Sequence, residues 1–360
     1  VVGSAASSTP RPEPASATGT ASPLAAVSPS GLFEDPTSFM STVHLKLLEQ
    51  FHDPDLAGTF QSEQAAVLNF VLHRTTSLQE RDMMLYTDAV EARTFMRANP
   101  EFKEPIFVDD KHIRQLVEPY SIKRVLDEKL QQVGVEALFS VIDPSATDSL
   151  STVHLTASEL SRRFQAPPSS SKLPINLLDF APADANPVQA IRQILFADKN
   201  DLLPNLWKQV TSSPSALTTE MRAGRPPYSW ATICESGGLT TPHMDIDGLS
   251  TFLTVAQGQF LFAYCSSMSP AALDQWHKQS ILTPLPDCRW QCVLMKTGQT
   301  VVFPAGTPHA VIRDIADNHT ITFGGRFLPP NQIHRFASVC EWQLANPDSA
   351  ALNEDPIKTV

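Results

Sequence analysis

The sequence has few charged residues, no basic surplus and no long apolar run. Charged residues make up 18% of the 360 positions, and 38 acidic side chains outnumber 27 basic ones, giving a net charge of -11. Proteins that bind nucleic acid through broad electrostatic contacts need a basic surface, so the sequence carries no strong indication of nucleic-acid binding. The acidic balance would suit a basic protein or peptide. No apolar run approaches the roughly 20 residues of a membrane-spanning helix, so no membrane segment is expected.

Cysteine is also scarce, and its spacing is irregular. The count is odd, and no Cys-x-x-Cys pair is present, which argues against a disulfide framework and against a zinc knuckle. We therefore expect reduced thiols and an intracellular protein, either nuclear or cytoplasmic. The five cysteines are Cys234, Cys265, Cys288, Cys292 and Cys340.

Composition divides the chain into four segments. Residues 1–30 are rich in Ser, Ala, Thr and Pro, which predicts a disordered arm. Residues 31–172 carry apolar side chains at three- and four-residue spacing and are predicted to be mainly helical. Residues 173–340 form a strand-rich domain, and residues 341–360 form a C-terminal tail. The helices predicted before residue 173 cover 38–51, 62–72, 76–96, 109–117 and 122–133, with a loop at 167–171.

The strand-rich segment contains many short apolar runs separated by turn residues. Such spacing is typical of an antiparallel barrel or a jelly roll, so the whole chain is predicted to be α+β. Helices are predicted at 188–197, 203–210 and 270–279. The predicted strands are 173–180, 229–234, 251–256, 260–264, 292–295, 300–303, 310–313 and 320–323.

One stretch within this segment carries metal-binding chemistry. His243 and Asp245 lie two residues apart in a strand-like run, and side chains at i and i+2 of a strand point to the same face. With His309 on a neighbouring strand they would form a two-histidine, one-carboxylate triad, which holds Fe(II) and leaves coordination positions open. The alternative is a surface histidine beside a solvated aspartate. Turns at Gly237-Gly238 and Gly248 bound the run and favour the metal site.

These motifs together resemble the JmjC family. The resemblance rests on Gly-Gly-Leu-Thr-Thr-Pro-His-Met-Asp ending at Asp245, and on Asp-Gly-Leu-Ser-Thr-Phe containing Thr251, followed by Val-Ala-Gln-Gly. It continues with Phe-Pro-Ala-Gly-Thr-Pro-His ending at His309 and with Phe323-Gly-Gly325. It covers about residues 173–330. The resemblance implies a double-stranded β-helix, the jelly-roll fold of the cupins.

The same resemblance implies an iron-dependent dioxygenase. His243, Asp245 and His309 would bind Fe(II), while 2-oxoglutarate and O2 would take the open positions. The oxidoreductase would hydroxylate or demethylate a protein or nucleic-acid substrate, and the resemblance does not choose between them. Thr240 and Thr251 match positions that often lie near 2-oxoglutarate.

The chain departs from the family at one position. Members of the family often carry a lysine that pairs with the distal carboxylate of 2-oxoglutarate, and Phe260 stands in its place. Arg326 is the preferred replacement cation, because its strand should neighbour the metal strands, and Arg313 is the second candidate. Tyr228 is expected to close the pocket, and His319 is expected to donate a hydrogen bond there or to sit in a turn.

Two other functions remain open at this point. The loss of the lysine favours a catalytically inactive binding module that keeps the cupin fold. The third possibility is a zinc or manganese cupin acting as an isomerase or hydrolase.

Overall fold

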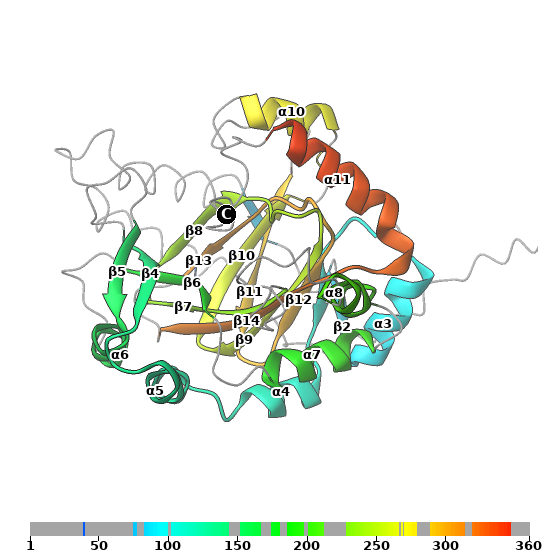
Figure 1. The fold of residues 1–360 in the computed structure, drawn as a ribbon. Coiled ribbons are helices and arrows are strands. Elements are labelled where there is room, and N and C mark those ends of the chain that lie inside the picture. Colours follow the sequence, from blue (N-terminus) through cyan, green and yellow to red (C-terminus); the bar gives the residue numbers. More distant parts are fainter. Residues whose placement is uncertain are drawn as a thin grey trace, which may run out of the picture.

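Two β-sheets lie face to face, and helices surround them (Figure 1). The chain therefore has a mixed α+β fold. The computed structural model describes Phe39, Met268 and the ranges 75–77, 83–99, 102–143, 152–166, 174–180, 186–197, 201–211, 228–265, 270–278, 289–313 and 319–346.

The smaller sheet has five strands and carries two of the predicted metal ligands. Most of its neighbouring strands are antiparallel, and only the edge pair β1–β11 is parallel. Its strands, in spatial order, are β1 (Thr75–Ser77), β11 (Trp290–Lys296), β10 (Gln259–Cys265), β13 (His309–Ile312) and β8 (Leu239–His243).

The larger sheet has nine strands, and its parallel pair is β2–β3. Its central strands come from the same part of the chain as the smaller sheet, whereas both edges come from residues before 173. In spatial order the strands are β2 (Met84–Tyr86), β3 (Ile106–Val108), β12 (Thr300–Phe303), β9 (Ser250–Gln257), β14 (Thr320–Phe327), β7 (Ser229–Cys234), β6 (Asn176–Phe180), β4 (Leu138–Ile142) and β5 (Thr152–Thr156).

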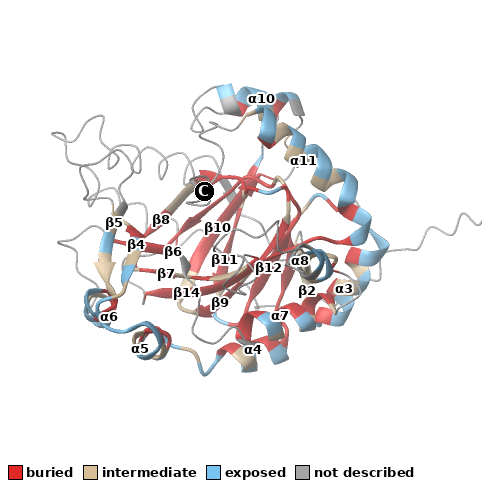
Figure 2. Cartoon of the chain, in the orientation of Figure 1, coloured by how far each residue is buried: buried red, intermediate tan, exposed pale blue. Residues whose placement is uncertain are grey.

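The strands bury side chains on both faces. Val301 and Phe303 of β12 join an apolar cluster that includes residues of both sheets, while Val302 between them packs in the cluster beneath the helices. This alternation follows from the two-residue period of a strand. Figure 2 shows the consequence, because the central strands are mostly buried, the edge strands β4 and β5 are partly exposed, and the helices expose their outer faces.

Helices cover the larger sheet and one end of the molecule. Several begin at a capping side chain: Asp110 accepts hydrogen bonds from the backbone N–H groups of His112 and Ile113, and Thr156 forms a reciprocal capping box with Glu159. The helices are α3 (Ala89–Ala98), α4 (Lys111–Val117), α5 (Ile122–Val133), α6 (Ala157–Gln165), α7 (Asn186–Phe196), α8 (Leu203–Thr211), α10 (Pro270–Lys278), the 3-10 turn η4 (Pro330–Gln332) and α11 (Ile333–Ala345).

The structure confirms the predicted strands of residues 173–340 to within a few residues, together with α5, α7, α8 and α10. The helix predicted over 76–96 is wrong in its first half, where β1 and β2 lie, and only α3 forms. A three-residue strand is too short to show alternation and is held by pairing with β11 or β3. Except for Phe39, the arm at 1–30, the helices at 38–51 and 62–72 and the loop at 167–171 lie outside the described residues.

The range predicted to be mainly helical also contributes strands β1 to β5 to the two sheets. The boundary predicted between residues 340 and 341 falls inside α11. Among the described residues, none of the helices combines the length and the apolar character needed to cross a lipid bilayer.

Candidate metal centre

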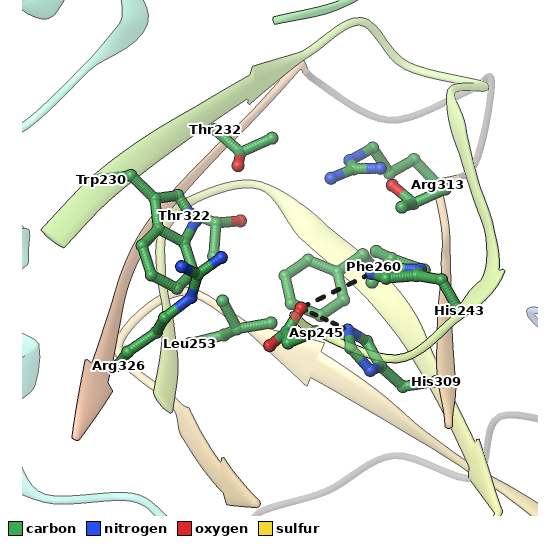
Figure 3. Close-up of a pocket in the computed structure, with 12 residues that line it drawn as sticks. Trp230, Thr232, His243, Asp245, Leu253, Phe260, His309, Arg313, Thr322 and Arg326 are labelled. Atoms are coloured by element: carbon green, nitrogen blue, oxygen red, sulfur yellow. Dashed lines mark ion pairs between the residues drawn. The ribbon is translucent and has the colours of Figure 1, made fainter. Parts of the chain in front are cut away.

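The two histidines are brought together by strand pairing. His243 is the last residue of β8, His309 is the first of β13, and the two are direct partners in the antiparallel register. Asp245 lies beyond the end of β8, in the loop that leads to β9. The two-residue spacing predicts that His243 and Asp245 share one strand, whereas in the structure Asp245 lies in the loop, which turns its carboxylate toward the two rings (Figure 3).

The three side chains form a compact and buried cluster. Their candidate ligand atoms all lie within 4.8 Å of one another. Asp245 Oδ1 is 3.7 Å from His243 Nε2 and 3.9 Å from His309 Nε2. These separations exceed hydrogen-bond length and leave room for an ion between the three atoms.

Both imidazoles are oriented by backbone carbonyl groups. The Nδ1 atom of His243 lies 2.7 Å from the carbonyl oxygen of Thr241, and Nδ1 of His309 lies 3.1 Å from that of Thr307. A carbonyl oxygen only accepts, so each Nδ1 carries the proton and donates it. Each Nε2 then has a lone pair facing Asp245, the arrangement that metal-binding histidines adopt.

Electrostatics favour the ligand forms of these groups. Burial, helped by the nearby His243, lowers the pKa of His309 to about 4, so His309 is neutral at pH 7. Burial alone would raise the pKa of Asp245, but the two histidines and Arg326 outweigh it and hold that pKa well below its usual range. A neutral imidazole and an ionised carboxylate are the forms that coordinate metals.

The metal-free protein should therefore lose stability as the pH falls from 6.5 toward 4. In the unfolded chain His309 takes up a proton near pH 6.5, whereas in the folded chain it does so at about 4. Between these values the unfolded state binds more protons, so stability falls as pH falls. Protonation of Asp245 adds to this loss of stability only below pH 4, because the pKa of an unfolded aspartate is about 4.

Urea denaturation at pH 7 and pH 4.5 measures this effect. The parent should lose on the order of 2 kcal/mol more than the His309→Gln variant, because each unit of pKa difference corresponds to about 1.4 kcal/mol. An equal loss in both proteins would contradict the assignment of a neutral buried imidazole at His309.

The cluster lies at one end of a pocket between the two sheets (Figure 3). The wall combines apolar and polar side chains from strands of both sheets. The lining residues are Trp230, Thr232, Thr240, His243, Asp245, Leu253, Phe260, His309, Val311, Arg313, Thr322 and Arg326.

Arg313 contributes an unsatisfied cation to this pocket. Its side chain is buried, and its Nε donates a 2.7 Å hydrogen bond to the hydroxyl of Thr320. Within the described part of the chain, its Nη1 has no hydrogen-bond partner, and neither has the buried hydroxyl of Thr322. Burial lowers the pKa of the Arg313 guanidinium. A buried guanidinium is costly unless an anion accepts its hydrogen bonds, so the geometry fits a bound anion.

The strand register explains how Arg313 relates to the missing lysine. Leu261 of β10 pairs with Ile312 of β13 in antiparallel register. The next residues along these strands are Phe260 and Arg313, and the Arg313 Cζ atom lies 5.9 Å from the centre of the Phe260 ring. The guanidinium thus lies just past the end of β13, beside Phe260, where the resemblance to the JmjC family predicts a lysine.

Arg326 also lines the pocket, but a carboxylate already pairs with it. Its Nη1 donates a 2.6 Å hydrogen bond to Asp247 Oδ2, and its Cζ lies 5.5 Å from the centre of the Trp230 ring. Asp247 belongs to the same loop as Asp245. Arg326 therefore links this loop to β14, and it is a weaker candidate for binding a free anion than Arg313.

Of the three other residues predicted to lie near the cosubstrate, one lines the pocket and two do not. Thr240 lines the pocket, and its hydroxyl accepts a 3.3 Å hydrogen bond from Asn176. Thr251 and Tyr228 lie outside the set of lining residues. The Thr251 hydroxyl donates a 2.5 Å hydrogen bond to Asp245 Oδ2, and the Tyr228 ring lies against the guanidinium of Arg192, 4.7 Å from its Cζ.

His319 lies away from the ligands, and its Nδ1 accepts a 3.1 Å hydrogen bond from the backbone N–H of Ser236. Trp230, Thr232 and Thr322 also line the pocket, although the sequence motifs do not predict them as site residues. The alternation of β7 could have found the first two, because residues 230 and 232 share one face of that strand.

The fold and the site together define an α+β protein with a buried cluster of two histidines and one carboxylate. No protein-family model matches the chain, and no curated protein matches it.

Proposed function

We propose that this protein is an Fe(II)- and 2-oxoglutarate-dependent dioxygenase of the JmjC type. The observation that carries the proposal is the presence, in one pocket, of the His243–Asp245–His309 cluster and the unsatisfied buried Arg313. The two facing sheets would be those of a double-stranded β-helix, with the metal ligands at one mouth.

The donor atoms suit iron. Two imidazole nitrogens and one carboxylate on one side of an ion form the facial arrangement of non-haem Fe(II) oxygenases. A closed structural zinc site would instead have four protein ligands. Among the described residues, the cluster has three members of the types His, Cys, Asp and Glu, which fits a site with open positions.

The pocket also suits the cosubstrate. 2-Oxoglutarate is a dianion, and its distal carboxylate needs a cation in a site that excludes water. Arg313 and Thr322 line the pocket that contains the proposed metal ligands, and the buried Nη1 and hydroxyl of these side chains have no hydrogen-bond partner among the residues that the structure describes. Arg313 replaces the absent lysine from the adjacent strand, so the substitution at Phe260 does not by itself remove the anion site.

Each residue would then have a defined task. His243, Asp245 and His309 would hold the iron, and Arg313 would orient the cosubstrate. When bound, the iron and 2-oxoglutarate supply the oxidising chemistry that acts on a C–H bond of the substrate. Phe303 packs against His309 with ring centres 4.7 Å apart and shields that ligand from water. The net charge of -11 favours a basic protein or peptide as substrate.

Succinate formation tests the proposal. The protein, loaded anaerobically with Fe(II) and supplied with 2-oxoglutarate, ascorbate and O2, should release succinate slowly without substrate, and calorimetry should detect 2-oxoglutarate binding. Failure of both would overturn the proposal.

Two alternatives would then be separated by metal analysis after mild purification. Protein without metal would support the inactive binding module that Phe260 favours, and bound zinc or manganese would support a different metal cupin.

A further inference from the structure

The loop that carries Asp245 has an unusual backbone. It joins β8 to β9, and its residues Asp247 and Gly248 have φ values of 69° and 59°. The left-handed region costs energy for a residue other than glycine, so Asp247 is strained. Such a conformation persists only where the surrounding structure holds it. The position of the metal-binding carboxylate therefore depends on whatever packs against this loop.

A single side chain of α11 holds both ends of this turn. The Nε2 of Gln343 donates a 2.8 Å hydrogen bond to the carbonyl oxygen of Asp245, and its Oε1 accepts a 3.1 Å hydrogen bond from the N–H of Gly248. Gln343 is 8% exposed. One amide group thus satisfies an acceptor and a donor three residues apart, and it holds the turn closed behind the Asp245 carboxylate.

The helix backbone also lies directly against the turn. A Cβ atom added to Gly248 would lie 2.8 Å from the carbonyl oxygen of Phe336 and 2.6 Å from the sulfur of Cys340. Only glycine fits such a close approach at this φ. The helix therefore packs closely against the loop at Gly248, through its backbone and the Cys340 side chain.

The same helix also contacts the turn that precedes His309. The Nε of Arg335 donates a 2.8 Å hydrogen bond to the carbonyl oxygen of Ala305. A Cβ added to Gly306 would lie 3.0 Å from Val339. The helix α11 thus contacts both the loop that carries Asp245 and the turn that precedes His309.

We propose that α11 is a positioning element for the metal centre and that Gln343 is the positioning residue for Asp245. The inference rests on the proposed metal site but not on the identity of the substrate. Hydrogen-bonded groups behind metal ligands fix their orientation, and their loss lowers metal affinity about 10- to 100-fold. We expect a change of that size when the Gln343 amide is lost.

Two variants separate the contributions of the two Gln343 hydrogen bonds. Gln343→Leu removes both hydrogen bonds at similar volume. Gln343→Glu keeps an acceptor for the Gly248 N–H but removes the donor to the Asp245 carbonyl. Ser338→Ala is the matched control, because the hydroxyl of this exposed residue donates a hydrogen bond within the same helix, to the carbonyl oxygen of His334.

Cobalt(II) serves as the probe, with affinity measured by titration and geometry by its visible absorption spectrum. Both Gln343 variants should bind Co(II) about 10-fold or more weaker than the parent with a shifted spectrum, while Ser338→Ala matches the parent. Hydrogen exchange at the Gly248 amide of the metal-free protein should accelerate in Gln343→Leu and stay slow in Gln343→Glu.

The outcomes distinguish this inference from the proposed function. Unchanged Co(II) affinity and spectrum in both Gln343 variants would overturn the positioning role while leaving the metal site intact. A parent that binds neither Co(II) nor Fe(II) would overturn the proposed function, and the positioning role with it. If Gln343→Leu fails to fold, the Co(II) affinity and spectrum of Gln343→Glu, compared with those of the parent, decide whether Gln343 positions Asp245.

Discussion

Replacing Asp245 with alanine should abolish iron binding and leave the protein folded. Asp245 supplies the negative charge of the site, and without it two neutral imidazoles remain. The loss of affinity should exceed the roughly 100-fold that removal of an outer hydrogen-bonding partner costs. The apolar clusters that stabilise the sheets do not include this residue, so cooperative unfolding should persist. Anaerobic Fe(II) titration and thermal unfolding provide the two measurements.

Control variants show whether the loss of any aspartate or histidine from the protein lowers iron binding. Asp127→Ala removes a carboxylate from the surface of α5, where Asp127 pairs with Lys123. His334→Ala removes an exposed histidine and is the control for His243→Ala and His309→Ala, which should also lose the metal. Full iron occupancy in Asp245→Ala would show that the ligand assignment is wrong.

The second large effect concerns the cosubstrate. Arg313→Leu should weaken 2-oxoglutarate binding by about 2 to 5 kcal/mol, or roughly 30-fold and more, because it leaves a buried carboxylate without its cation. Arg326→Ala should have a smaller effect, since Arg326 is already paired with Asp247. Calorimetry with the metal-loaded, oxygen-free protein measures both affinities. Equal losses in the two variants would contradict the preference for Arg313.

A double variant tests the geometry more directly. Phe260 and Arg313 are the chain neighbours of the paired residues Leu261 and Ile312 and lie side by side. A lysine at position 260 would therefore reach the region that the guanidinium occupies. Phe260→Lys combined with Arg313→Leu should recover part of the affinity that Arg313→Leu loses. No recovery would indicate that the anion lies elsewhere in the pocket.

The cluster of His243, Asp245 and His309 could be predicted from the sequence because its signals are local. His243 and Asp245 are two residues apart, and His309 follows a Pro-Ala-Gly-Thr-Pro turn. What could not be anticipated is the choice between Arg313 and Arg326. That choice depends on which guanidinium already has a carboxylate partner, and Asp247 meets Arg326 only after the loop folds back.

The contribution of the first half of the chain was harder to predict for a different reason. The strand β3 has three residues, and its apolar Ile106-Phe-Val108 run has no alternation because all three side chains are buried. Its strand identity comes from pairing with β12, almost 200 positions away in the chain. The role of Gln343 was equally hidden, since a glutamine within a helix carries no signal of a loop that it contacts.

The way in which the two sheets are completed has a consequence for any attempt to shorten the protein. The strands β12, β6 and β11 each pair on one side with a strand that precedes residue 173. A fragment starting at that residue would expose unpaired backbone N–H and C=O groups along the edges of β12, β6 and β11. Such edges pair with other chains, so the fragment would be prone to self-association even though it retains His243, Asp245 and His309.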